Sequence, residues 1–392
     1  MRDALYLAWR YLVYHRFKTA ILITSITLIV FLPVGLRVLV SQSADQLTTR
    51  AEATPLIIGA RGSPLELVLN SLYFESDVPA LMKYAEVARV DTSELALAIP
   101  LYVRFRARSY PIVGTTLEYF EFRGIRIGEG SNLTTLGDCV LGARVAAELA
   151  IRPGESIISS PENVFDIAGV YPLKMRVVGV LEFSDSPDDH AIFVDLKTAW
   201  VMEGAGHGHQ DLDQREAAAA VLSRDSANIV ANAALVQYNE ITPDNIESFH
   251  FHGDLGDFNI TAIVAIPPDQ RSAALLRGRY ESADDVSQIV PPLTVMDELL
   301  ETILTIQSYV IVAVVVVGLS TLATAALVFI LSLRLRRREI ETMLRIGGSR
   351  ASIGWIVVSE IIVVLSTSVV LATGLTFITS RFGSAAIRAL IL

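Results

Sequence analysis

Residues 334–360 read RLRRREIETMLRIGGSRASIGWIVVSE, a charged segment between two long apolar runs. The run before it, residues 307–333, contains no charged side chain, and the run after it, residues 353–380, contains only Glu360. Each run exceeds the roughly 20 residues that a helix rising about 1.5 Å per residue needs to cross a hydrocarbon core of about 30 Å. The sequence therefore predicts two membrane spans joined by a short loop.

The loop itself, residues 334–352, is rich in arginine, which in short loops favours the cytoplasmic side of the membrane. Its side chains have helical spacing, and the two faces consist of Arg337, Glu341 and Arg345 on one side and Ile340, Met343 and Leu344 on the other. Gly347 and Gly348 are expected to end this helix, and Ser349 to cap the next one. The loop is interpreted as a helix that docks a partner; alternatively, its arginines serve only as a topology signal.

The composition predicts a protein that is partly in and partly outside a membrane. Of the 392 residues, 52% are hydrophobic and 19% are charged, a balance too apolar for an ordinary soluble protein. The net charge is −10. Basic residues concentrate beside the membrane spans, whereas the long middle segment is acidic, and this distribution argues against a nucleic-acid partner. The single cysteine, Cys139, excludes an internal disulfide.

The N-terminal residues predict another membrane segment. Residues 1–18 form an expected amphipathic helix at the cytoplasmic interface, because apolar and basic side chains lie on separate faces. Residues 19–40 then form the first span. A cleaved signal peptide is the alternative, although the apolar run is longer than the roughly 7 to 15 residues typical of such a peptide.

Residues 41–303 contain no run long enough to cross a bilayer and are expected to form an extracytoplasmic α+β domain of two subdomains. Runs of β-branched residues predict strands within 101–106, 175–181, 191–195 and 259–266. Helices are expected at 64–75, 144–151 and 268–280, and an inserted subdomain at about 124–237. The predicted fold class is thus a transmembrane α-helical bundle of three spans with a large α+β domain outside.

Enzyme motifs are missing from the sequence. It contains no GxxxxGK[ST] loop, so no nucleotide is expected to bind directly, and no GxSxG, HExxH or CxxC. The chain is therefore interpreted as non-catalytic.

The loop motif and the order of spans carry a resemblance to a known family. The pattern R-x-x-E-x-x-L-R-x-x-G-x-x-x-x-I, followed by an acid within the next span, is matched by Arg338, Glu341, Leu344, Arg345, Gly348, Ile353 and Glu360. Residues 140–146, 177–181 and 192–196 also resemble that family's periplasmic core. The chain thus resembles the FtsX/MacB-like permeases of ABC transporters.

This resemblance implies a function and a set of partners. A separate ATPase subunit would grip the loop through Arg337, Arg338, Glu341, Leu344, Arg345, Gly347 and Gly348. ATP hydrolysis would then move the periplasmic domain and drive export or extraction of a substrate. The resemblance implies that the chain lies in the bacterial inner membrane, in contact with lipid, with its N-terminus in the cytoplasm. The implied partners are a second permease chain and a periplasmic adaptor or substrate-binding protein.

The chain departs from the family pattern at its C-terminus. Family members usually have a fourth span, whereas only the short tail 381–392 follows the third one here. Either the chain is a three-span variant or the sequence is truncated.

Glu360 lies about two turns into its span, where an ionised carboxylate costs up to about 3 kcal/mol. It is expected to face the bundle interior or a dimer seam and to contact, for instance, Arg10 or Arg16. The alternative is an acid that reaches water at the interface.

Histidines cluster in the external domain. They are His190, His207, His209, His250 and His252. Two H-x-H pairs offer the nitrogen ligands that zinc accepts, because residues i and i+2 of a strand share a face. Solvated loop histidines are the alternative.

Three functions thus remain open from the sequence: a permease subunit that transports, a non-transporting ABC subunit that signals or regulates a hydrolase, and a membrane-anchored zinc-binding ectodomain.

Overall fold

The structure, a computed structural model, describes residues 2–160, 172–208, 221–224, 229–231, 239–282, 285–347 and 349–391. The chain divides into two compact units. The helical unit comprises residues 1–49 and 297–392, and the mixed unit comprises residues 50–296. Each is described separately.

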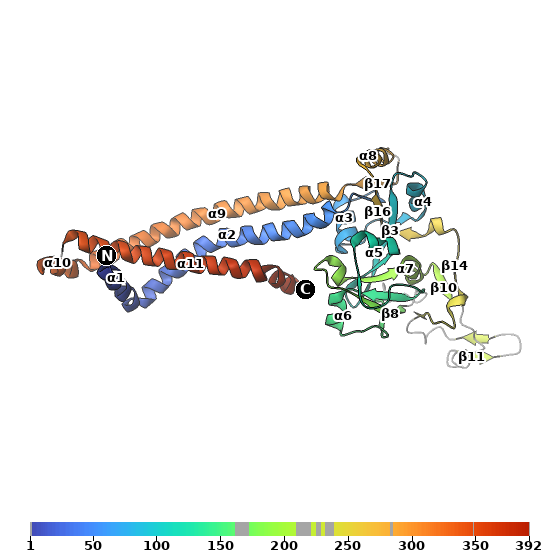
Figure 1. Cartoon of the computed structure of the whole chain (residues 1–392), viewed down its shortest axis with the longest axis horizontal. Helices are drawn as coiled ribbons and strands as arrows, with labels where there is room; N and C mark the ends of the chain where they lie inside the picture. Colours follow the sequence, from blue (N-terminus) through green and yellow to red (C-terminus); the bar gives the residue numbers. More distant parts are fainter. Residues whose placement is uncertain are drawn as a thin grey trace. The chain divides into compact units, whose positions relative to one another are not determined.

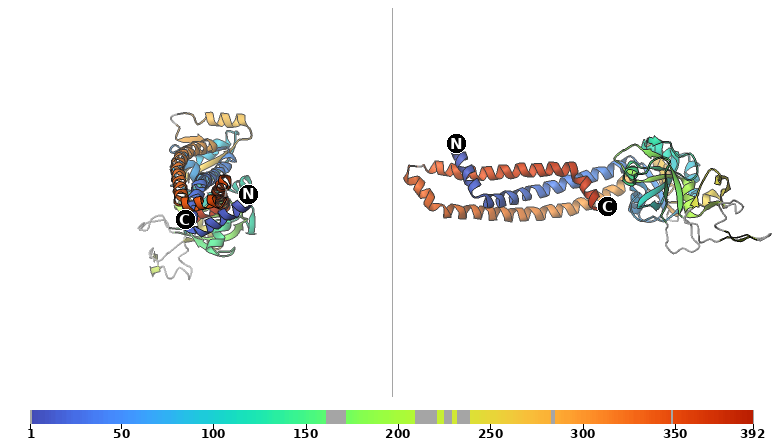
Figure 2. Two further views of the ribbon diagram at one scale, coloured as in Figure 1. Left: turned by 90° about the vertical axis from the view of Figure 1, so that its left-hand side faces the viewer. Right: turned by 90° about the horizontal axis from the view of Figure 1, so that it is seen from below.

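Among its described residues, the helical unit contains three helices long and apolar enough to cross a membrane, as predicted. The candidate spans are Arg16–Gln42, Pro292–Leu335 and Arg350–Phe382. Figure 1 shows their helices lying side by side, with α10 joining two of them, and Figure 2 shows the same neighbours from another direction. The helices are α1 (Arg2–Tyr14), α2 (Arg16–Glu52), α9 (Pro292–Leu335), α10 (Arg337–Arg345) and α11 (Arg350–Ile391).

A small apolar cluster holds the helical unit together. Leu12 of α1, Leu22 and Ile26 of α2, and Val364 of α11 are all buried in it. Beside this cluster the hydroxyl of Thr27 donates to the carbonyl of Ser368 at 3.3 Å. Most other apolar side chains of the three long helices are exposed, which suits surfaces that face lipid.

In the part of the chain that the structure describes, the mixed unit is built on an 11-stranded sheet. Its central path runs β13-β8-β6-β9-β4-β3-β16-β1-β17, and β5 and β7 pair with β8. Neighbours β4 and β9 are parallel, as are β6 and β8, whereas β3 pairs antiparallel with both β4 and β16. The strands are β1 (Leu56–Ala60), β3 (Leu97–Ala107), β4 (Tyr110–Thr115), β5 (Ile127–Gly130), β6 (Asp138–Leu141), β7 (Ser156–Ile158), β8 (Leu173–Leu181), β9 (Ile192–Asp195), β13 (Asn239–Glu240), β16 (Ala262–Ile266) and β17 (Ser287–Val290).

Short two-stranded ladders and helices complete this unit. The ladders are formed by β2 (Met82–Lys83) with β15 (Asn259–Ile260), β10 (Gly206–Gly208) with β14 (Phe249–Phe251), and β11 (Val221–Arg224) with β12 (Ile229–Ala231). The α-helices are α3 (Pro64–Tyr73), α4 (Ala85–Asp91), α5 (Leu117–Arg123), α6 (Ala143–Leu149), α7 (Leu196–Glu203) and α8 (Gln270–Gly278). The 3₁₀ turns are η1 (Pro187–His190), η4 (Ile246–Ser248) and η5 (Leu255–Asp257).

The expected mixture of strands and helices is confirmed, with one correction. The predicted strand 259–266 is two strands, because Thr261 interrupts it. The Thr261 hydroxyl donates to the carbonyl of Leu101 at 3.0 Å and accepts from the amide of Val103 at 3.0 Å. The amide of Thr261 also donates to the Leu101 carbonyl, at 2.9 Å, so the side chain replaces a backbone group only as the acceptor for Val103. On either side of Thr261, β15 pairs with β2 and β16 pairs with β3. The limits of the inserted subdomain stay a prediction.

A buried ion pair anchors the start of the mixed unit. Arg50, in the last turn of α2, donates two hydrogen bonds to Asp188, at 2.7 and 2.9 Å, and a third to the hydroxyl of Tyr119 at 2.8 Å. Burial would raise the pKa of Asp188, but the Arg50 guanidinium outweighs that effect and holds it below its ordinary value. Burial also raises the pKa of the Tyr119 hydroxyl to about 12, so it stays a hydrogen-bond donor. The network fixes the last turn of α2 to η1 and α5.

Replacing Asp188 by Asn should destabilise the mixed unit by about 3–5 kcal/mol, because it leaves the Arg50 charge buried without a counter-charge. Asp185→Asn is the matched control: its pair with Arg144 is 3.9 Å long and exposed, so the cost should stay below about 1 kcal/mol. Denaturant unfolding followed by Trp200 fluorescence, in a background with Trp9 and Trp355 changed to Phe, measures both.

Acid should remove the same stabilisation. The folded pKa of Asp188 is lowered, so its contribution is complete above the unfolded value of about 3.9 and is lost as pH falls through the folded value. The stability difference between wild type and Asp188→Asn should therefore shrink below about pH 4. Equal destabilisation by the two Asn variants at neutral pH would contradict the anchoring role.

Candidate functional site

The loop between two of the spans folds into the short helix α10. Arg336 interrupts the helical path between α9 and α10, and Gly347 follows α10 with a φ of +95°. That angle is unfavourable for residues with a Cβ atom. The Ser349 hydroxyl accepts from the amide of Ser352 at 3.1 Å and caps α11. The C-terminal end of α10 and the start of α11 therefore lie where the sequence predicts them.

The two faces of α10 differ as expected. Ile340, Met343 and Leu344 are half-buried, whereas the predicted coupling side chains Arg337, Arg338, Glu341 and Arg345 are exposed. Arg337 donates to Glu341 at 3.1 Å, with both side chains largely exposed. Gly347 is exposed as well, and Gly348 lies outside the described residues. A charged surface thus faces away from the helical unit, and its role as an ATPase contact stays a prediction.

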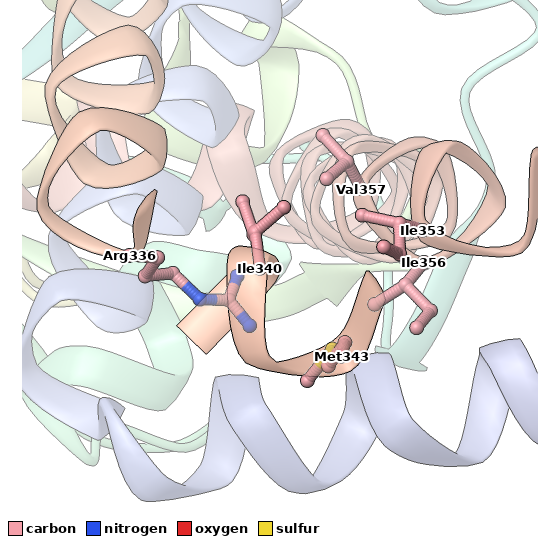
Figure 3. A pocket seen from close by; sticks show the side chains of 6 residues that line it. All are labelled: Arg336, Ile340, Met343, Ile353, Ile356 and Val357. Carbon is pink, nitrogen blue, oxygen red and sulfur yellow. The ribbon is translucent and has the colours of Figure 1, made fainter. Parts of the chain in front are cut away.

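The apolar face of α10 packs on the first turns of α11. Figure 3 shows Ile340 and Met343 directed toward Ile353, Ile356 and Val357. The space among these side chains and Arg336 is about 20 Å³, roughly enough for one water molecule. It is a packing gap rather than a ligand site, so α10 is held against α11 by apolar contact.

A buried ion pair lies beside this contact. Arg336 donates to the carboxylate of Glu360 at 2.9 Å, and the two side chains are 15% and 4% exposed. The Arg336 guanidinium also lies 3.6 Å from the centre of the Tyr11 ring, a distance suited to a cation–π interaction. The tyrosine hydroxyl in turn lies 3.3 Å from that of Ser332. One guanidinium therefore connects α1, the α9–α10 junction and α11.

This geometry changes the partner that the sequence suggested for Glu360. The carboxylate is buried inside the helical unit, as expected, but its observed partner is Arg336 instead of Arg10 or Arg16. Arg336 belongs to the loop 334–352, which the sequence predicts to be cytoplasmic, and it lies 24 positions before Glu360. The sequence contained a signal for it: Arg336 precedes Ile340 by four residues and Met343 by seven, so in the helical register it lies on the apolar face and was the arginine best placed to turn inward.

Replacing Glu360 by Gln should destabilise the helical unit by about 1.5–3 kcal/mol, the range for losing a hydrogen bond to a charged group. Glu341→Gln is the matched control, because it removes the same charge from an exposed pair and should cost no more than about 0.5 kcal/mol. Unfolding by SDS, followed by circular dichroism at 222 nm, measures the two changes. A Glu360→Gln variant as stable as Glu341→Gln would show that the buried pair contributes nothing.

The structure brings two of the five candidate metal ligands together. His250 and His252 are adjacent, with their Nε2 atoms 3.0 Å apart. His207 is the register partner of His250 in the β10–β14 ladder. His190 ends η1, and His209 lies outside the described residues. Among the described residues no group of three or more His, Cys, Asp or Glu side chains is close enough to hold an ion.

A second cavity of about 260 Å³ lies in the mixed unit beside β8 and η4. Two ion pairs line it: Arg176 with Asp138 and Lys174 with Glu240, each at 2.8 Å. The volume is slightly below the usual range of about 300–1,000 Å³ for ligand pockets, and such pockets are mostly apolar. The cavity is therefore small and charged for a ligand pocket, and α10 is the candidate functional site.

A protein-family model matches more than half of the chain. Residues 19–238, more than half of the chain, match the model of the MacB-like periplasmic core domain. No curated protein matches the chain.

Two solved structures are similar in part. They are the extracellular domain of the noncanonic ABC-type transporter YknZ from Gram-positive bacteria (10% identity, 60% of this chain and 98% of that chain covered, TM-score 0.32) and the periplasmic region of MacB from Actinobacillus actinomycetemcomitans (13% identity, 66% and 97% covered, TM-score 0.33). Their superposition on the chain is weak, so the family assignment rests on the sequence match.

Proposed function

Because the chain belongs to the MacB-like family of ABC transporter permeases, we propose that it is a membrane subunit that couples a separate ATPase to movement of its own extracytoplasmic domain. One observation carries this proposal. The short helix α10, set between two candidate spans, packs its apolar face on α11 and presents Arg337, Arg338, Glu341 and Arg345 outward. An exposed, charged helix fixed to two spans is suited to bind a protein and to pass on its motion.

The contacts at α10 explain how a bound ATPase would act on the spans. Arg336 connects Glu360 of α11 with Tyr11 of α1. A displacement of α10 would therefore move these helices together, since separating them would expose a buried charge. In this proposal ATP is hydrolysed by the partner, and the chain contributes no catalytic residue.

The family setting supplies the remaining parts of the proposal. The chain would lie in the bacterial inner membrane with its N-terminus and α10 in the cytoplasm and the mixed unit in the periplasm. A second permease chain would complete the assembly. Movement of the mixed unit would drive export or extraction of a substrate, with a periplasmic adaptor or substrate-binding protein as the outer partner.

The docking role predicts a loss of binding when the charged face is removed. A tagged chain, purified from its native host in detergent, should copurify with an ABC ATPase identified by mass spectrometry. Changing Arg338, Glu341 and Arg345 together to Ala should reduce the recovered ATPase more than tenfold, because these side chains lie on the exposed face.

The matched control changes Arg271 and Arg277 of α8, which lie in the mixed unit, to Ala. This variant should retain the ATPase. Equal recovery with the α10 variant and with wild type would refute docking at α10. A complex that hydrolyses ATP but exports nothing would favour a regulatory subunit over a transporting one.

The proposed orientation can be tested by thiol labelling. Cys139 is fully buried, and burial raises the pKa of its thiol well above the ordinary value, so it gives little background. Thr342→Cys on α10 should react with a membrane-impermeant maleimide in inside-out vesicles only, and Glu121→Cys in right-side-out vesicles only. The reverse pattern, or labelling of both on one side, would exclude the orientation.

A further inference from the structure

Helix α1 is held to the helical unit by one of its faces. Ala8 and Leu12 are buried, and α1 packs against α11. The Thr19 hydroxyl of α2 donates to the carbonyl oxygen of Leu12 at 3.0 Å, so a carbonyl in the last turn of α1 has a partner beyond its own helix. Figure 1 shows α1 meeting the start of α2 at an angle. These contacts decide which face of α1 is left outward.

The outward face of α1 is largely aromatic. The side chains of Tyr6, Trp9 and Tyr14 are 63%, 57% and 82% exposed, and Val13 beside them is exposed as well. In the helical register these four positions lie opposite the buried Ala8. Tryptophan and tyrosine are enriched where a membrane meets water, because their rings are apolar and carry a polar atom at one end. The outward face therefore has the composition of a membrane–water interface.

A basic side chain shares this face. Arg10 is exposed and lies four positions from both Tyr6 and Tyr14, the spacing that places residues on one side of a helix. The sequence suggested separate apolar and basic faces, whereas the exposed positions place the guanidinium among the aromatic rings. A guanidinium can bind a phosphate group through two hydrogen bonds. Rings and guanidinium together suit the layer of lipid phosphates.

A second cation lies at the start of α2. The amine of Lys18 lies 6.0 Å from the centre of the Tyr11 ring and 5.6 Å from that of Phe329. Among the described residues, Lys18 forms no ion pair. Glu360, the carboxylate that acts on it electrostatically, is paired with Arg336. Lys18 thus carries a positive charge that the helical unit leaves without a counter-charge of its own.

The length of the first span places these side chains at its edge. The candidate span Arg16–Gln42 has 27 residues, which as a helix are about 40 Å long. This exceeds a hydrocarbon core of about 30 Å and approaches the 40–45 Å of a bilayer with its headgroups. Arg16 is exposed, and α1 ends at Tyr14. Arg16 and the end of α1 therefore lie at the level of the headgroups.

Acidic residues do not offset these cations locally. Residues 4–44 contain neither Asp nor Glu, whereas Arg10, Arg16 and Lys18 fall within nine positions of each other. A basic residue close to an anionic lipid surface gains about fivefold in affinity. The charge and the level in the membrane together select a negatively charged leaflet as the binding partner.

We propose that the outward face of α1, together with Arg10, Arg16 and Lys18, binds the headgroups of anionic phospholipids. The aromatic rings lie among the headgroups, and the three cations contact the phosphates. The Tyr11 ring lies close to both Lys18 and Arg336, so bound lipid stabilises the contact between α1 and the α9–α10 junction. This surface is distinct from the charged face of α10 and does not depend on an ATPase.

The direct test uses Trp9 as a reporter in the full-length chain, reconstituted into phosphatidylcholine vesicles. Trp355→Phe removes the other exposed tryptophan, and Trp200 is buried in the mixed unit. Phosphatidylglycerol or phosphatidylcholine with brominated acyl chains is then added, since bromine quenches nearby tryptophan. Phosphatidylglycerol should quench Trp9 with an apparent association constant at least fivefold higher than that of phosphatidylcholine.

Two variants locate the preference. Arg10→Gln with Arg16→Gln should reduce it below twofold, and adding Lys18→Gln should abolish it. The matched control is Arg37→Gln with Arg381→Gln, which removes the same charge from exposed positions of α2 and α11 and should keep the full preference.

Two further readouts separate lipid binding from other causes. Quenching by brominated phosphatidylcholine should be equal in wild type and all variants, because it reports that α1 still lies in the bilayer. Raising the ionic strength to about 1 M, where the Debye length is about 3 Å, should reduce the preference for phosphatidylglycerol. Inorganic phosphate at unchanged ionic strength should not reduce it, because the surface binds lipid in a leaflet and not the free anion.

Three results would overturn the proposal. One is equal quenching of wild-type Trp9 by the two brominated lipids. Another is a preference that survives in the variant lacking all three cations. The third is a loss of preference in the Arg37, Arg381 control as large as in the Arg10, Arg16 variant, which would indicate a response to total charge.

Discussion

A carboxylate within a membrane-spanning helix requires a compensating charge, and the helical unit depends on how this requirement is met. Glu360 is buried, and Arg336 pairs with it across the turn between two spans. Removing either partner would leave the other charged in an environment of low dielectric, which is far more costly than losing an exposed pair. The same guanidinium lies over Tyr11 of α1. The position of α10 therefore follows from an electrostatic requirement inside the bundle as well as from apolar contact.

The mixed unit uses the same kind of interaction at its own start. Arg50 and Asp188 are buried, and Tyr119 donates to the carboxylate at 2.9 Å. Each of the two buried pairs connects segments that are separated in the chain, by 24 positions in the helical unit and by 138 in the mixed unit. Helix α2 has residues in both units, since the division falls between residues 49 and 50. The last turn of α2, which belongs to the mixed unit from Arg50 on, cannot separate from η1 without exposing two charges.

The sequence predicts well what depends on neighbouring residues and less well what depends on distant ones. The three spans, the faces of α10 and its end at Gly347 follow from local periodicity and from one residue's backbone freedom, and they are observed. The partner of Glu360 was not predicted correctly, because charge alone does not distinguish Arg336 from Arg10 and Arg16. The division of 259–266 into two strands was also missed, since Thr261 breaks the strand through contacts with β3. Both errors concern contacts between residues that are distant in the sequence: Arg336 and Glu360 are 24 positions apart, and Thr261 and Leu101 are 160 apart.

The four arginines at 334, 336, 337 and 338 carry the same charge, and the fold gives them different surroundings. Arg336 turns inward to Glu360, whereas Arg337 and Arg338 are exposed on α10. The inward arginine is stabilised whether or not a partner is bound, so α10 can hold its place before an ATPase arrives. The outward side chains remain in water, where a protein partner can contact them without first breaking a buried pair. Preorganisation of this kind lowers the ordering cost of docking. It also means that changes to the exposed face should alter partner binding while leaving the helical unit intact.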